Sequence, residues 1–93
     1  APPPLEEEAY AKLLERAWDL ADSDLPMAET LFKRALADKP GDLEAEYGYG
    51  YVLLYQDKKA AAAPHLCAAR KAADADIRQD ASGLVETHEL RCP

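Results

Sequence analysis

The strongest constraint on the fold of this chain is an internal repeat with a period of 33 to 34 residues. Ala28, Phe32 and Ala35 recur 34 positions later as Ala62, Leu66 and Ala69. Upstream of each block, Leu14, Ala17, Trp18 and Leu20 recur 33 positions later as Tyr47, Gly50, Tyr51 and Leu53. Each unit therefore holds two blocks of helical spacing, and two-helix units of this period are typical of solenoids, whose neighbouring units bury a shared core.

Apolar residues at steps of three and four predict five helices, over about residues 6–21, 26–38, 43–55, 59–73 and 76–89. Polar and turn-forming runs separate the first four: Asp22-Ser23-Asp24, Lys39-Pro40-Gly41-Asp42 and Gln56-Asp57-Lys58. Pro26 falls in a first helical turn, where proline is tolerated.

The residues of the two units match a known pattern. The second unit reads Tyr49-Gly50-x-x-Leu53, then Ala62-x-x-x-Leu66-x-x-Ala69, and the first reads Ala17-x-x-Leu20, then Ala28-x-x-x-Phe32-x-x-Ala35-x-x-x-x-Pro40. Over about residues 9–76 this pattern resembles the tetratricopeptide repeat (TPR) family. The chain departs from it at Asp74, where a closing proline is usual, and at Arg16, where Leu or Tyr is usual.

The resemblance implies an all-α fold, a short right-handed α-solenoid of two helix-turn-helix hairpins (about residues 9–42 and 43–75). Residues 76–93 are expected to form a C-terminal capping helix and tail, because two units are fewer than such arrays usually need. The apolar stripe of that helix should lie on the helix before it. Residues 1–8 are expected to be a linker or N-terminal extension, since Pro2–Pro4 favour polyproline structure.

Charge and motif content argue against several classes of function. The chain has 11 Lys+Arg against 18 Asp+Glu and a net charge of −7, whereas nucleic acids and anionic membranes require a basic footprint. No apolar stretch approaches the ~20 residues of a membrane span. No phosphate-binding glycine loop or G-x-S-x-G motif is present. We therefore expect no enzyme, no cofactor, no nucleic-acid partner and no membrane insertion.

In the resembled family, the first helix of each unit lines a concave surface. Its exposed positions correspond here to Leu14, Trp18, Tyr47, Tyr51 and Tyr55. Aromatic surfaces of this kind are typical of binding hot spots, so the resemblance implies a partner-binding groove. Packing of the same residues into the core or an oligomer contact is the alternative, and sugar stacking is a further one. The carboxylate clamp of some relatives is not expected, because the chain contains no Asn.

Two cysteines, Cys67 and Cys92, allow two interpretations. Either they are a buried thiol and a free thiol, or they form a disulfide that ties the tail to the body. His65 and His88 are further ligand types, but His65 and Cys67 point to opposite sides of a helix. His88 and Cys92 have i, i+4 spacing only if the helix persists to the tail, and two ligands do not make a structural zinc site. No metal site is expected.

These observations predict a non-enzymatic protein-interaction module. Its concave surface, centred on Trp18 and Tyr51, would bind a peptide or helix of a partner. Acidic rim residues would favour a basic flank on that partner: Asp19, Asp22, Glu44 and Glu46. The alternative is a structural segment of a larger, self-associating solenoid scaffold, possibly in a bacterial envelope complex. A disulfide would indicate the bacterial periplasm or cell envelope, and free thiols the cytoplasm.

Overall fold

The computed structural model describes the backbone of residues 5–93 and the side chains of residues 8–93. Within this range the regular elements are all helices, with no strand. The five helices are α1 (Leu5–Leu20), α2 (Leu25–Asp38), α3 (Leu43–Leu54), α4 (Lys59–Ala69) and α5 (Ala75–Thr87). The helix α1 begins at Leu5, earlier than the first unit was expected to begin. The linker expected at Pro2–Pro4 lies outside the described residues.

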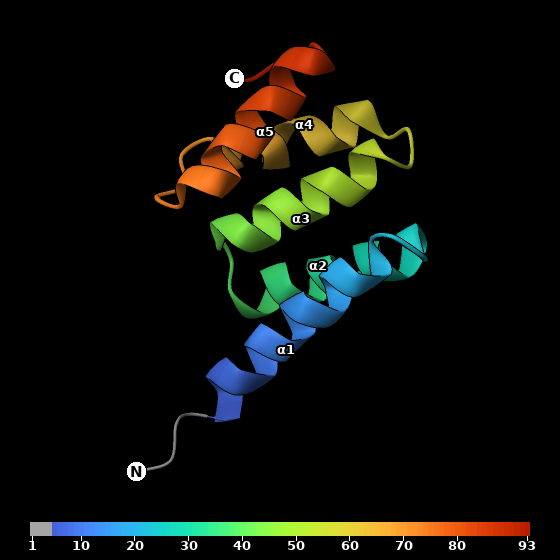
Figure 1. Ribbon diagram of the computed structural model, residues 1–93, viewed down its shortest axis with the longest axis vertical. Coiled ribbons are helices and arrows are strands. Elements are labelled where there is room, and N and C mark those ends of the chain that lie inside the picture. Colours follow the sequence, from blue (N-terminus) through green and yellow to red (C-terminus); the bar gives the residue numbers. More distant parts are fainter. Residues whose placement is uncertain (1–4) are drawn as a thin grey trace.

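The helices are stacked in two layers (Figure 1). Each helix packs against the next one in the chain, and in addition α1 contacts α3 and α3 contacts α5. Within the described range α2 and α4 do not touch, so α1, α3 and α5 form one layer and α2 and α4 the other. The result is an elongated body of 47 × 28 × 20 Å, with α1 and α5 at opposite ends. No helix of residues 5–93 has the length and apolar character needed to cross a membrane.

Aspartates cap three of the helices at the expected turns. The Asp24 carboxylate accepts a hydrogen bond from the Met27 N–H (3.2 Å), and Asp42 accepts one from the Ala45 N–H (3.4 Å). Asp74 accepts bonds from two N–H groups of α5, at 2.9 and 3.3 Å. Each cap satisfies amide groups that the first helical turn leaves unpaired. Gly41 lies before Asp42 at φ +84°, in the left-handed region that favours glycine.

Two glycines of α3 allow the helices to approach closely. An alanine Cβ built at Gly48 would lie 2.1 Å from the Phe32 ring of α2, and one built at Gly50 would lie 2.7 Å from Leu66 of α4. Phe32 and Leu66 are both fully buried. Each large side chain therefore fills the space that a missing Cβ leaves on α3, and α3 joins the two halves of the core.

The helix α4 ends at Ala69, earlier than the predicted Ala73. The chain then makes two tight turns, with hydrogen bonds from Lys71 N–H to Ala68 O and from Ala72 N–H to Ala69 O, both 3.1 Å. The Arg78 guanidinium of α5 donates to the carbonyls of Ala72 and Ala73, at 3.0 and 3.3 Å. A side chain from the next helix therefore satisfies two carbonyls of the segment that follows α4.

The last helix lies on α4 as expected, with Ala81 and Val85 buried. It ends at Thr87 because Glu89 adopts a left-handed conformation (φ 53°) and the Leu90 N–H donates back to Val85 O at 2.9 Å. The tail therefore turns back toward α4. The helical i, i+4 spacing of His88 and Cys92 is not realised.

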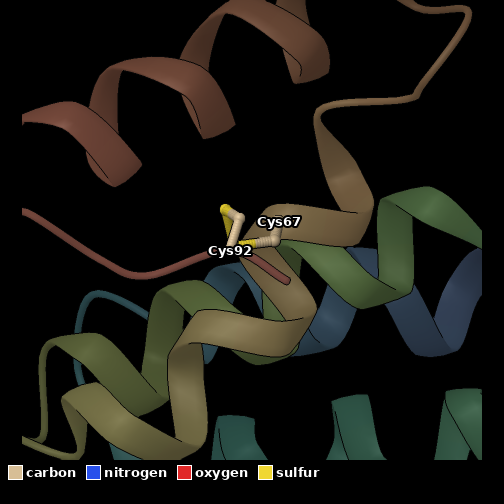
Figure 2. Close-up of a disulfide and its surroundings, with 2 residues drawn as sticks. All are labelled: Cys67 and Cys92. Carbon is tan, nitrogen blue, oxygen red and sulfur yellow. A yellow bond between two sulfur atoms is a disulfide. The ribbon is translucent and has the colours of Figure 1, made fainter.

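Cys67 and Cys92 form a disulfide, with a Cα–Cα distance of 5.5 Å (Figure 2). Cys67 lies on α4 and is buried, and Cys92 comes from the returning tail. Leu90 and Cys92 pack against the same buried cluster as Leu66. The disulfide interpretation is confirmed, and the two-thiol alternative is wrong.

Candidate partner-binding surface

Five ring-bearing side chains form a continuous surface over the layer of odd-numbered helices. We call it the aromatic surface and define it as Trp18, Tyr47, Tyr51, Tyr55 and His88. Trp18 of α1 lies 5.4 Å from Tyr47 and 5.7 Å from Tyr51, between ring centroids. Tyr51 and Tyr55 are 4.6 Å apart, and Tyr55 is 6.5 Å from His88 at the end of α5. Aromatic rings are therefore in contact distance from α1 across α3 to α5.

The repeat explains why these residues meet. Tyr47, Tyr51 and Tyr55 are spaced i, i+4, i+8 and follow one ridge of α3 and its C-cap. The same positions, 33 residues later, are Asp80, Leu84 and His88 on α5 and its C-cap. Because α3 packs against both α1 and α5, equivalent positions of the three helices lie side by side. The contribution of α5 was missed in the sequence, although the 33-residue shift contains the signal for it.

The predicted site residues differ in exposure. Leu14 is only 7% exposed and belongs to the same buried cluster as Phe32, so it is a core residue and its assignment to the exposed groove is wrong. Trp18 is half-buried, with its ring edge-on to Phe32 at 4.9 Å. Tyr47 and Tyr51 are half-buried, whereas Tyr55 is 51% exposed. Trp18 therefore fixes one end of the aromatic surface against the core, and Tyr55 is its most exposed ring.

A hollow of about 320 Å³ lies beside the aromatic surface, between α3 and α5. Its walls come from two tyrosines of α3 and five residues of α5: Tyr47, Tyr51, Gln79, Asp80, Gly83, Leu84 and Thr87. Gly83 leaves open space there, since an added Cβ would meet no atom within 4 Å. The hollow is large enough for one or two side chains of a partner.

The electrostatics of this surface are acidic. Burial, and then the neighbouring Asp80 carboxylate, raise the pKa of Tyr47 to about 12. Burial, followed by Tyr55 and Asp22, also raises the pKa of Tyr51. Both phenols are therefore neutral hydrogen-bond donors at physiological pH, beside the carboxylates of Asp22 and Asp80.

The expected acidic rim is only partly present. Asp19 and Asp22 are exposed and Glu44 is half-buried. Glu46 lies on another side of α3, where its carboxylate pairs with His65 Nδ1 of α4 at 2.5 Å. Glu46 is therefore a contact between α3 and α4, not a rim residue, and Asp80 of α5 takes its place beside the tyrosines.

We expect alkaline pH to destabilise the domain through Tyr47. Its pKa is 10.0 in the unfolded reference and about 12 in the folded state, so folding favours the neutral phenol. The stability this provides is complete below pH 10 and is lost as the pH rises through 12. Circular dichroism across this range should show a steeper loss of stability for wild type than for Tyr47→Phe, reversible on return to neutral pH. Equal slopes for the two proteins would contradict the prediction.

The four candidate metal ligands do not form one site: His65, Cys67, His88 and Cys92. Cys67 and Cys92 are bonded to each other, and His65 is held by Glu46 and lies edge-on to Tyr49, 4.6 Å away between ring centroids. Among the described residues, no cluster of three or more His, Cys, Asp or Glu side chains is placed to hold a metal ion.

No protein-family model matches the chain, and neither a curated protein nor a solved structure is significantly similar to it. The resemblance to the TPR family therefore rests on the repeated residues themselves.

Proposed function

We propose that this domain is a TPR-like, non-catalytic module that binds an apolar peptide or helix of a partner protein on its aromatic surface. The observation that carries the proposal is the continuity of the aromatic surface over α1, α3 and α5, beside an open hollow. Exposed aromatic rings held by packing from below provide contact area at low cost in conformational entropy.

The packing supports a solenoid of two hairpins closed by α5. Phe32 of the first hairpin lies against Gly48 of the second, as helices of successive repeats do in stacked arrays. The odd-numbered helices lie in one layer, which is the side that solenoids of this kind use for binding (Figure 1).

The chemistry of the surface defines the partner. An apolar side chain fits the hollow between Tyr47 and Leu84, while Asp80 and Asp22 offer carboxylates at its border. Because both carboxylates lie beside neutral tyrosines, a Lys or Arg next to the apolar anchor would complete the contact. We therefore propose a partner segment with an apolar face and a basic flank.

The alternative role is that of an internal segment of a longer solenoid, and the exposed charges of α1 argue against it. The residues by which α3 meets α2 are Ala45, Gly48 and Val52, all buried. Their equivalents on α1, 33 positions earlier, are Lys12, Glu15 and Asp19, all exposed. A further repeat stacked on α1 in the same register would bury the charges of Glu15 and Asp19 and the Lys12–Glu8 ion pair, at a cost of several kcal/mol. Sedimentation analysis should accordingly give a monomer, whereas a cut solenoid would self-associate.

A displayed library of random peptides tests the proposed function. We expect selection on the wild-type domain to enrich peptides that combine Leu, Phe or Ile with Lys or Arg. Tyr55→Ala and Gly83→Leu should each weaken the binding of the enriched peptides at least tenfold, because the first removes the most exposed ring of the aromatic surface and the second fills the hollow. Neither should unfold the domain, because Tyr55 is exposed and leucine is a better helix former than glycine.

Met27→Ala is the matched control, because Met27 is 48% exposed but lies on α2, in the other layer. Its affinity for the same peptides should stay within twofold of wild type. Enrichment that is insensitive to Tyr55 and Gly83, or no enrichment at all, would reject the aromatic surface as the binding site.

The disulfide supports an oxidising compartment, such as a bacterial periplasm or cell envelope, as the place where the domain works. Alkylation of unreduced, unfolded protein should add no label to either cysteine. Two labels on protein taken from its native source would instead favour the cytoplasm.

A further inference from the structure

A second hollow lies away from the aromatic surface, at the opposite end from α5. It has a volume of about 630 Å³ and opens between the N-terminal half of α1 and the C-terminal half of α2. Ala9, Tyr10 and Leu13 of α1 contribute its apolar lining. Four cations and one carboxylate complete it: Lys12, Arg16, Arg34, Lys39 and Asp38. We call it the basic hollow.

The repeat shows how the lining of this hollow differs from the equivalent positions of the second hairpin. In the second, the positions equivalent to Arg34 and Asp38 are Ala68 and Ala72, which are small enough for α4 and the turn after it to lie close to α3. The equivalents of Leu13 and Arg16 are Glu46 and Tyr49, which both contact His65 across the hairpin. The first hairpin therefore has long charged side chains where the second has alanines.

The charge of the basic hollow is opposite to that of the chain. Its lining has a formal charge of +3, whereas the whole chain carries −7. Among the described residues, no ion pair engages Arg16 or Arg34, and both are exposed. Lys12 pairs only with the exposed Glu8, at 3.2 Å. Several cations therefore converge on one apolar floor, and within residues 8–93 only Asp38 of the lining opposes them.

The floor of the hollow is held in place. The Tyr10 hydroxyl donates to Asp42 Oδ2 at 2.6 Å, which ties α1 to the N-cap of α3. Lys39 Nζ lies 4.4 Å from the centre of the Tyr10 ring, so this cation is positioned beside the floor. A site with a fixed aromatic wall loses little conformational entropy when it is occupied.

We propose that the basic hollow is a second docking site, which takes an acidic peptide segment with an apolar anchor. The anchor fits against Leu13 and Tyr10, and Asp or Glu side chains of the segment pair with Arg16 and Arg34. Shape and charge argue for a short peptide: the hollow is recessed between two helices, and the net charge of −7 of the whole chain would repel a flat anionic membrane. The domain would then connect two partners of opposite charge, a basic one at the aromatic surface and an acidic one at the basic hollow.

Selection from a displayed peptide library, with subtraction on an Arg16→Glu/Arg34→Glu variant, tests this site. We expect the wild type to enrich peptides rich in Asp and Glu with one or two Leu or Ile. Synthesised, these should bind the charge-reversed variant at least tenfold more weakly, and their affinity should fall with salt. Lys33→Glu is the matched control, an exposed cation on the same helix outside the hollow, and should change affinity less than threefold.

The two sites are separable, because Gly83→Leu should leave the acidic peptides bound. Failure to enrich acidic peptides over the charge-reversed variant would overturn the proposal, whatever the result at the aromatic surface. A loss of affinity with Lys33→Glu equal to that with the charge-reversed variant would overturn it too. Binding of anionic vesicles through Arg16 and Arg34, or charge-dependent self-association in sedimentation, would assign the hollow to a membrane or to a second copy instead.

Discussion

Replacing Gly48 with alanine is expected to lower the free energy of unfolding by about 2 kcal/mol, although alanine is the better helix former. The new Cβ would lie 2.1 Å from the ring of Phe32, which is fully buried, so the ring or the helix backbone must shift. Overpacking of this kind typically costs 1–3 kcal/mol or more, which exceeds the roughly 1 kcal/mol gained from helix propensity. Thermal unfolding should shift down by about 10 °C.

Gly83→Ala is the matched control, since both glycines lie inside helices but an added Cβ at Gly83 meets nothing within 4 Å. This variant should be more stable than wild type by up to about 1 kcal/mol. Adding Phe32→Leu to Gly48→Ala should recover part of the lost stability, because leucine is smaller than phenylalanine. A double-mutant cycle would measure this recovery as coupling between the two positions. If both alanine variants were stabilised alike, the close approach of α2 and α3 would be wrong.

Loss of the Cys67–Cys92 disulfide is expected to cost about 3.5 kcal/mol. The bond joins residues 25 apart in sequence, and opening such a loop restores conformational entropy to the unfolded chain. Denaturant unfolding of wild type with and without a reductant measures the difference. Cys92→Ser should match the reduced wild type, because it keeps the buried Cys67 in place on α4. A midpoint that does not respond to reductant would contradict a structural role for the bond.

Beyond this global loss of stability, the C-terminal half should also open locally. Leu90 and Cys92 pack against the cluster that holds Leu53 and Leu66, whereas Phe32 belongs to the other cluster. We therefore expect amide exchange in Cys92→Ser to be accelerated most in the tail and in α5, and less in α1 and α2. Equal acceleration in all five helices would show instead that the bond acts only through the unfolded chain.

Much of the helical architecture could be predicted because its signals are local. Asp24, Asp42 and Asp74 begin helices by bonding amides two or three residues away, and a left-handed glycine precedes Asp42. The periodicity of alanine and of large apolar residues marked Phe32 and Leu66 as core, and both are fully buried. The predicted ends of α4 and α5 were wrong because contacts with other segments decide them. The Arg78 guanidinium donates to carbonyls that follow α4, and the chain reverses at Glu89, where no glycine marks the end of the helix.

The candidate site divides in the same way. The tyrosine ridge of α3 follows from i, i+4 spacing alone, and the repeat places Trp18 beside it. Exposure does not follow from spacing, because Leu14 and Tyr47 occupy equivalent positions and yet only Leu14 is buried. The role of Asp80 and the opening at Gly83 depend on how α5 lies against α3, a contact between segments that no local pattern encodes.

The sequence by itself therefore determined the helices, the two repeated units, the aromatic ridge and the acidic balance of the chain, since each depends on residue type and on spacing within a few turns. Only the tertiary structure decided which ridge residues face solvent, that Cys67 and Cys92 are joined, and that four cations gather at one hollow of an acidic domain. These features depend on the distance between helices, and that distance is set by side-chain volume at a few contacts, such as Gly48 against Phe32.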